Sequence, residues 1–219
     1  MDRRFEPGSA PACYRSPMAL FRARVLAILI GAAASGAIVP SAREASASVS
    51  IAATLDRVLR EATASAIATP TEQRAVWENG RIYTYTRVHV DRAIAGELST
   101  GSDAWVRTMG GIVGKIGHAV DGEAVLTVGR PCLLFLHPGP VGAFEVTARA
   151  QGQFPVVADD ARAMRVIRSS GVGALVPAAS SSRVTRPAPQ ALAADVIHGR
   201  LIDDVARDIA AAWNKIHAK

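Results

Sequence analysis

The feature that most constrains the fold is the alternation of apolar and polar side chains over residues 81–94. Successive side chains of a strand point to opposite faces, so this pattern predicts a strand with one buried and one solvated face. At about 14 residues the strand exceeds the usual length, and we expect it to curve or to contain a bulge. The expected buried face holds Ile82, Thr84, Thr86, Val88 and Val90, and the expected solvated face holds Tyr83, Tyr85, Arg87, His89 and Asp91.

A hairpin turn is predicted directly before this strand. Asn79-Gly80 favours a type I′ turn, because both central positions of that turn need positive φ. The partner strand covers residues 64–77, and Pro70 places it at a sheet edge or interrupts it, since proline cannot donate to a ladder. Shorter strands are predicted over residues 103–108, 124–128, 132–136, 143–150 and 153–157.

Helices are expected on either side of the strands. Apolar residues recur at helical spacing over residues 48–63, which predicts an amphipathic helix capped by Ser48 or Ser50. A Ser-, Ala- and Pro-rich stretch over residues 169–190 is typical of a linker. A second amphipathic helix follows over residues 191–219, and its polar face mixes both charge signs. We therefore expect it to dock on the barrel, with a partner-binding or membrane-surface helix as the alternatives.

The first 47 residues have the pattern of an export signal. Arg22 and Arg24 precede an apolar run over residues 25–39, and Ala45-Ser46-Ala47 matches a cleavage site. The apolar run is shorter than the ~20 residues that a membrane span needs. We therefore predict that residues 1–47 are a signal peptide, with Met18 as a possible true start, and that the rest is periplasmic or extracellular without a stable membrane span.

Charge and cysteine content exclude some classes of function. The chain has a net charge of +6, but residues 1–47 hold six arginines and three acids, which leaves +3 for the remainder. That charge is small and dispersed, so nucleic-acid binding is not expected. Cys132 is the one cysteine after the signal, which rules out a disulfide framework. Its apolar surroundings favour a buried side chain over a catalytic thiol.

A glycine-rich stretch, residues 109–118, is the main candidate for chemistry. The stretch does not match the Walker A motif of phosphate-binding loops, because Met109 stands in place of the first glycine and Ile116 in place of the Ser or Thr. Gly114-Lys-Ile-Gly117 matches the short G-x-x-G loop of RNA-binding KH domains. The match is weak, because the motif is short, the flanking residues are predicted to be strands and the chain is predicted to be exported. The glycines are better explained by sharp bending in a small barrel. Lys115 and His118 remain as candidate binding residues, and a hydrolase site near Met109 and His118 remains an alternative.

Other motifs for catalysis or metal binding are missing from the sequence. There is no H-E-x-x-H and no G-x-S-x-G, and no spacing pairs the acids as glycoside hydrolysis would need. We therefore predict no catalytic residues, no metal ligands and no cofactor. His118 and His137 flank the middle of the expected barrel and could meet in space, but each is expected at the surface or in a turn. Tyr83, Tyr85 and Arg87 share one strand face and are candidate binding residues, with ordinary cross-strand pairing as the alternative.

Several segments together resemble a known module. They are Trp77-Glu-Asn-Gly-Arg-Ile-Tyr-Thr, Val88-His-Val-Asp-Arg-Ala-Ile-Ala-Gly96, Trp105-Val-Arg-Thr and Gly129-Arg-Pro-Cys-Leu-Leu-Phe-Leu136. Their apolar spacing resembles the netrin-like module shared with tissue inhibitors of metalloproteinases, and exported bacterial proteins of that shape. The resemblance implies a five-stranded OB-type Greek-key barrel. Those inhibitors use an N-terminal cysteine and disulfides, which this chain lacks, so no site residue is carried over.

These observations lead to one expected fold and three hypotheses on function. The fold is mainly β (α+β): a small OB-like Greek-key β-barrel over residues 64–168, with an N-terminal and a C-terminal packing helix. The first hypothesis is a non-enzymatic binding module whose partner is another exported protein or a cell-envelope component. The alternatives are an inhibitor or accessory factor of a secreted protease, and a hydrolase acting near residues 109–118.

Overall fold

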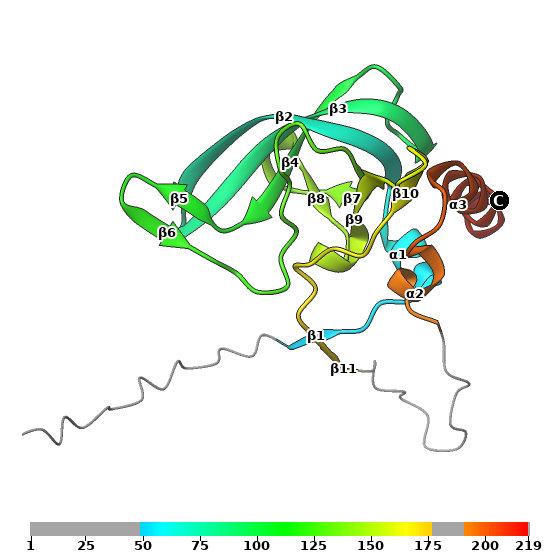
Figure 1. Cartoon of the computed structure of the whole chain (residues 1–219). Coiled ribbons are helices and arrows are strands. Elements are labelled where there is room, and N and C mark those ends of the chain that lie inside the picture. The colour runs from blue at the N-terminus through cyan, green and yellow to red at the C-terminus, as the bar shows by residue number, and fades with distance from the viewer. Residues whose placement is uncertain (1–48, 177–190, 219) are drawn as a thin grey trace, which may run out of the picture. The chain divides into compact units, whose positions relative to one another are not determined.

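The structure is a computed structural model that describes residues 49–176 and 191–218 (Figure 1). The predicted signal peptide at residues 1–47 lies outside the described residues, as do Ser48 and residues 177–190. Within the described ranges, none of the helices has the length and apolar character needed to cross a membrane. The described chain is mainly β and forms a small closed barrel with helices packed against it, which confirms the predicted fold class.

A long hairpin forms one side of the barrel. Strand β2 (Ala64–Glu78) pairs antiparallel with β3 (Arg81–Gly96), and the turn between them has φ of 48° at Asn79 and 78° at Gly80. The predicted two-residue turn is therefore confirmed. The pairing register shifts between Ser65 and Ala66, between Ile67 and Ala68, and between Pro70 and Glu72. These irregularities are the expected bulges, and they let the two long strands curve around the barrel.

Five strands close the barrel. From β2 and β3 the ring continues through β4 (Asp103–Met109) and β8 (Phe144–Val146) to β7 (Cys132–Pro138), which pairs with β2. The β4–β8 pair is parallel and the other neighbours in the ring are antiparallel. Strand β7 pairs with β2 only over residues 64–68 of β2, so Pro70 lies beyond that pairing, where its missing donor costs no ladder bond.

The remaining strands are short. Strands β9 (Gln153–Ala158) and β10 (Met164–Val166) extend the sheet from β7, and β5 (Gly111–Val113) and β6 (Ile116–His118) form a separate hairpin. Single-turn 3-10 helices occur at η1 (Pro140–Gly142) and η2 (Arg149–Gly152). The strand predicted over residues 124–128 is wrong: this segment is a loop whose Ala124 and Leu126 side chains enter the barrel core.

Two hydrophobic cores lie on opposite sides of the sheet. The interior of the barrel contains Cys132, which confirms the prediction of a buried side chain, and its burial raises the pKa of the thiol to about 12. Alternate side chains of β7 point outward, where Leu133 and Phe135 pack under the helices. The interior core also holds Ala64, Ala68, Val88, Ala104, Val106, Ala124, Leu126, Leu134, Leu136 and Val146.

Three helices cover the outer core: α1 (Leu55–Glu61), α2 (Ala193–Ile197) and α3 (Ile202–His217). The predicted helix over residues 48–63 begins later than expected, with Thr54 rather than a serine as its N-cap. The reason is that Val49–Ile51 forms strand β1, which pairs parallel with β11 (Ala174–Val176) and leaves Ile51 exposed. The segment predicted as a linker, residues 169–190, therefore contains structured residues at its start: Ser169 is buried, and β11 follows.

The C-terminal helix docks on the domain, as the sequence predicts. Val205 and Ile209 are buried in the same core as Val58 and Leu59 of α1, and Trp213 packs at its margin. Arg92 of β3 donates a hydrogen bond to Asp203 at 2.6 Å and ties the start of α3 to the barrel. The helical layer therefore covers the outer face of β7 and β9 (Figure 1), and none of the described residues of this outer core comes from β4 or β8.

Candidate functional site

A row of polar side chains crosses the uncovered outer face of the barrel. Tyr85 of β3 lies opposite Arg107 of β4, Arg107 lies opposite Glu145 of β8, and Glu145 lies opposite His137 of β7. Val106, Val146 and Leu136, each next to a member of the row, fill the barrel interior. Because successive side chains of a strand alternate in direction, the four polar side chains must face outward together.

Arg107 is the centre of this row. Its Nη1 donates to Glu145 Oε1 at 2.6 Å and its Nη2 donates to Glu78 Oε2 at 2.8 Å, while the guanidinium carbon lies 3.5 Å from the centre of the Tyr83 ring. The side chain is only 10% exposed. Burial alone would lower the pKa of Arg107, but its two carboxylate partners raise it above the ordinary arginine value. Arg107 therefore stays charged and fixes the direction of Glu145.

Tyr85 differs from the prediction of a solvated side chain. It is 8% exposed and its hydroxyl donates to Glu78 Oε1 at 2.6 Å. Desolvation, together with the charge of Glu78, raises the pKa of Tyr85. The cause is the curvature of the long hairpin, which brings Glu78 at the end of β2 over the outer face of β3. Tyr85 is thus part of the support for the row and is not available as a free binding residue.

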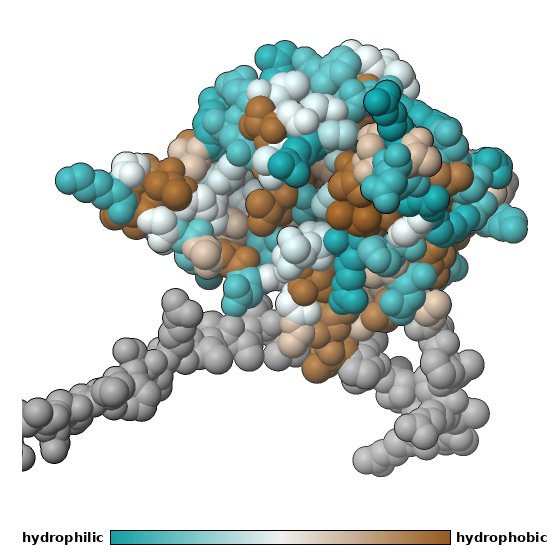
Figure 2. Space-filling view, viewed as in Figure 1, coloured by the Kyte–Doolittle hydropathy of each residue, from teal (hydrophilic) through white to brown (hydrophobic). Residues whose placement is uncertain are grey.

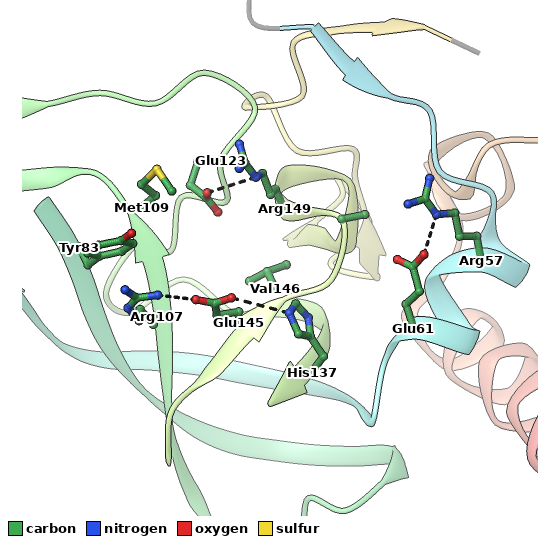
Figure 3. Close-up of a pocket in the computed structure, with 11 residues that line it drawn as sticks. Arg57, Glu61, Tyr83, Arg107, Met109, Glu123, His137, Glu145, Val146 and Arg149 are labelled. Atoms are coloured by element: carbon green, nitrogen blue, oxygen red, sulfur yellow. Dashed lines mark hydrogen bonds and ion pairs between the residues drawn. The ribbon is translucent and has the colours of Figure 1, made fainter. Parts of the chain in front are cut away.

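A pocket of about 450 Å³ opens beside this row (Figure 3). Its wall comes from β3, β4, β7, β8, η2, helix α1 and the loop before β7. In Figure 3 the carboxylates of Glu123 and Glu145 approach the pocket from opposite sides, with Arg149 and His137 beside them. The complete lining consists of Arg57, Glu61, Tyr83, Arg107, Met109, Glu123, His137, Glu145, Val146, Ala148 and Arg149.

Glu123 is the most buried acid of the pocket. Its Oε1 accepts a hydrogen bond from the backbone N–H of Ala124 at 3.1 Å, and its Oε2 lies 3.8 Å from Nε of Arg149. Desolvation raises the pKa of Glu123, and the charge of Glu145 adds to the rise, while the backbone N–H groups of Ala124 and Met109 and the charge of Arg149 offset part of it. The distance to Arg149 exceeds that of a hydrogen bond, so this pair is open.

The backbone that carries Arg149 is strained. Ala148 and Arg149 have φ of 55° and 54°, a left-handed conformation that non-glycine residues rarely adopt. Strain of this kind persists only where neighbouring contacts hold it, and it concentrates at functional sites. Here the next residues hold it: Ala150, Gln151 and Gly152 are all buried, and Ala150 N–H donates to Gly122 O at 3.1 Å.

Gln151 connects the pocket to the N-terminal segment. Its side-chain oxygen accepts from the N–H of Ala53 at 2.8 Å, and its Nε2 donates to the carbonyl of Ile51 at 2.9 Å. These bonds fix the chain two residues before α1 begins. Helix α1 in turn presents Arg57 and Glu61, which form an ion pair at 2.8 Å at the edge of the pocket.

His137 holds the opposite side of the pocket. Its Nδ1 lies 3.2 Å from the hydroxyl of Thr147, and its Nε2 lies 3.7 Å from Oε2 of Glu145. As with Glu123 and Arg149, the second contact is longer than a hydrogen bond. The pocket thus combines fixed charges with polar groups whose bonding capacity is incompletely used.

The candidate residues from sequence divide into two groups. Tyr83 lines the pocket and Tyr85 supports it through Glu78. Arg87 lies outside it, in an exposed ion pair of 2.7 Å with Asp103. Lys115 and His118 are exposed on the β5–β6 hairpin and do not line the pocket, so His118 and His137 do not meet there.

The glycines at the start of the glycine-rich stretch allow backbone conformations and close contacts that other residues would not. Gly110 and Gly111 have φ of 103° and 136°, and a side chain at Gly111 would collide with Thr84 and Ala75. Gly111 and Gly117 then lie in regular pairing with His118 and Ile112. The hairpin projects from the barrel, and hydrophobic surface is exposed on it (Figures 1 and 2). The expectation that these glycines shape the chain is therefore confirmed.

Most of the pocket residues were missed by sequence reasoning, including Arg107, Glu123, His137, Glu145 and Arg149. One available signal was the alternation in β4 and β8, where Arg107 and Glu145 are polar neighbours of core residues. The strand pairing that unites them spans 38 residues of sequence and follows only from the ring closure. Within the described ranges, no group of three or more His, Cys, Asp or Glu side chains is arranged to hold a metal ion.

No family model, curated protein or solved structure matches the chain. The geometry of the pocket itself is therefore the basis for a functional proposal. Its walls offer both hydrogen-bond donors with positive charge and acceptors with negative charge, at fixed positions. Such a surface can bind a small polar molecule without further chemistry.

Proposed function

We propose that this protein is an exported binding module that takes a small polar ligand into the pocket between β4, β7, β8 and α1. The observation that carries the proposal is a cavity of about 450 Å³ lined by three arginines, three glutamates and a histidine. Its volume lies in the range of ligand pockets, ~300–1,000 Å³.

Preorganisation of the pocket supports this function. Arg107 is held by two carboxylates and the Tyr83 ring, and it fixes Glu145 before any ligand arrives. The strained Arg149 backbone and the Gln151 contacts fix the opposite wall. A site that is already ordered loses less conformational entropy on binding, so its contacts contribute more to affinity.

We include in this proposal that the barrel is of the OB type and that the protein is exported. The ring order, in which the third and fifth barrel strands are parallel neighbours, supports an OB-type barrel and the netrin-like resemblance. The signal-like segment at residues 1–47 supports export. The ligand would then come from the cell exterior, as a free molecule or as part of an exported protein or cell-envelope component.

Thermal unfolding of the full chain with a panel of polar compounds tests the proposal. The panel holds amino acids, short peptides, neutral sugars and sugar acids. A ligand at about 100 times its Kd adds ~2.7 kcal/mol to the stability of the folded state, which gives a clear rise in Tm. We expect at least one compound class to raise the Tm of the wild type.

Two arginine variants locate the binding. Arg149→Ala should abolish the rise in Tm, because it removes a cation of the pocket wall. Arg130→Ala removes the same charge from an exposed loop residue outside the pocket and should keep the rise. A panel without any effect, or an equal effect on both variants, would contradict a ligand site in this pocket.

A further inference from the structure

We infer that the ligand of this pocket carries both an ammonium and a carboxylate group, as a free amino acid or a short peptide does. The inference rests on the proposed function and adds the chemical class of the ligand. Its first support is charge balance: Arg57, Arg107 and Arg149 face Glu61, Glu123 and Glu145 in one cavity. A net anion or a net cation would meet as many repelling as attracting charges, whereas a molecule with separated opposite charges can match both.

Two contacts of the pocket are open, and they lie on opposite sides of it. Oε2 of Glu123 is 3.8 Å from Arg149, and Oε2 of Glu145 is 3.7 Å from His137. Both distances exceed hydrogen-bond length. An ammonium that donates to both carboxylates would complete their bonding. It would also relieve the repulsion between them, since the charge of Glu145 acts on Glu123.

The carboxylate of the ligand has its partners in two arginines of the pocket lining, Arg149 and Arg57. Within the described residues, no hydrogen bond uses the Nη groups of Arg149. Arg57 likewise donates only through Nε, to Glu61. The side chains of these two residues are about half exposed, so their guanidinium groups can reach a carboxylate with paired N–H donors. The strained backbone at Arg149 holds one of these donors in the pocket wall.

A neutral sugar fits the wall less well. The Tyr83 ring, the aromatic surface of the pocket, already has the Arg107 guanidinium 3.5 Å from its centre and offers no free face on that side. Hydroxyl groups would also desolvate Glu123 and Arg149 without supplying charge to either. The volume of about 450 Å³ exceeds the need of a single small amino acid and leaves room for a dipeptide.

Calorimetric titration of the full chain tests the ligand class, with glycylglycine as the probe. N-acetylglycylglycine lacks the ammonium, glycylglycinamide lacks the carboxylate, and glucose serves as the neutral sugar. Each charged contact that is lost should lower affinity by about tenfold or more. We therefore expect glycylglycine to bind at least about tenfold more tightly than either blocked analogue, and glucose not to bind.

Variants assign the two ends of the ligand. Glu145→Gln and Glu123→Gln should each weaken glycylglycine and leave the residual affinity for N-acetylglycylglycine unchanged, because that analogue lacks the group they contact. Arg149→Ala should weaken glycylglycine and leave glycylglycinamide unchanged. Glu72→Gln and Arg130→Ala are exposed controls that should alter nothing. Far-UV circular dichroism of each variant confirms folding.

The outcomes separate the inference from the proposed function. Equal affinity for glycylglycine and its blocked analogues would overturn the inference. Binding of glucose or another panel compound that depends on Arg149, without binding of glycylglycine, would overturn the inference and keep the proposed function. Absence of binding for every compound, with the wild type folded, would overturn both.

Discussion

At the scale of single residues, Arg107 combines hydrogen bonds to two carboxylates with a contact to an aromatic ring, which no other type of side chain could do at this position. It donates to Glu78 through two nitrogens, to Glu145 through a third, and lies on the Tyr83 ring. The planar guanidinium allows these contacts together, whereas the ammonium of lysine is a single charge without a flat face. The direction of Glu145, and with it the shape of the pocket, therefore depends on this arginine.

Arg107→Lys should destabilise the fold by about 2 kcal/mol, because two carboxylates lose their fixed partner. The loss stays below that of a wholly buried pair, since Glu78 and Glu145 keep some contact with water. Urea unfolding measures it. The matched control is Arg87→Lys, whose ion pair with Asp103 is exposed and whose replacement should leave stability unchanged within error. Equal effects of the two variants would contradict the role of Arg107.

Glu123 gives the protein a pH dependence of known sign. Burial raises its pKa in the folded state above the ordinary value of 4.5. The unfolded chain then loses this proton at lower pH than the folded chain, so stability declines as pH rises above 4.5. Glu123→Gln removes the ionisation and should raise Tm at pH 7, with a gain that disappears as pH falls toward 4.5.

Thermal unfolding of Glu123→Gln between about pH 4 and pH 8 measures this dependence, since the window begins near the ordinary pKa and extends well above it. Glu72→Gln is the control, because it removes the same charge from an exposed position on β2 outside the pocket. A gain for Glu123→Gln that grows toward acid pH would contradict the burial of an ionisable carboxyl in the pocket.

At the scale of elements, the pocket depends on how α1 is attached. Helix α1 has only seven residues and would not persist alone. It is fixed by Val58 and Leu59 in the outer core and by the bonds of Gln151 to the segment that precedes it. The position of Arg57 at the pocket edge is thus determined by a residue almost a hundred positions away.

Gln151→Ala should lower the free energy of unfolding by about 2 kcal/mol, because it leaves a buried N–H of Ala53 without its acceptor. Chemical denaturation measures the loss. Asn214→Ala, at an exposed position of α3, serves as the control and should change stability by no more than ~0.5 kcal/mol. Hydrogen exchange of α1 should become faster in Gln151→Ala alone, and equal exchange in both variants would contradict the attachment.

Docking of α3 has an equally direct test. Ile209 is 1% exposed in the outer core, so Ile209→Ala should cost about 3 kcal/mol of folding stability. Ile112 is 72% exposed on the β5–β6 hairpin, and the same substitution there should cost less than ~0.5 kcal/mol. Urea unfolding of the pair compares them. A small effect at Ile209 would show that α3 does not pack on the barrel in solution.

The sequence predicts these elements where a local pattern is strong. Alternation identifies β3, Asn79-Gly80 identifies its turn, and the apolar stripe identifies α3 and its docking. The sequence does not predict β1, because its parallel pairing with β11 joins distant parts of the chain. It also does not predict the burial of Tyr85, because only the folded hairpin brings Glu78, seven residues earlier, to the tyrosine hydroxyl. The pocket was missed for the same reason: its acids, arginines and histidine come together only when β8 closes the ring between β4 and β7.

At the scale of the whole molecule, one curved sheet separates two cores, and the pocket lies where the outer layer ends. Helices cover β7 and β9 on the outside, while β4 and β8 remain uncovered and polar. The edge of the helical layer and the polar row form the walls of the cavity. The fold thus places a preorganised charged site beside the outer hydrophobic core, which suits binding without large conformational change.

The most direct test of the central claim is an amide NMR titration of the ¹⁵N-labelled full chain with glycylglycine. If the pocket is the ligand site, the resonances that shift should cluster at Glu123, His137, Glu145 and Arg149, and those of the β5–β6 hairpin, including Lys115, should not move. Saturable shifts confined to residues outside the pocket lining would contradict the claim, and the absence of shifts at millimolar probe would contradict a ligand that carries both an ammonium and a carboxylate.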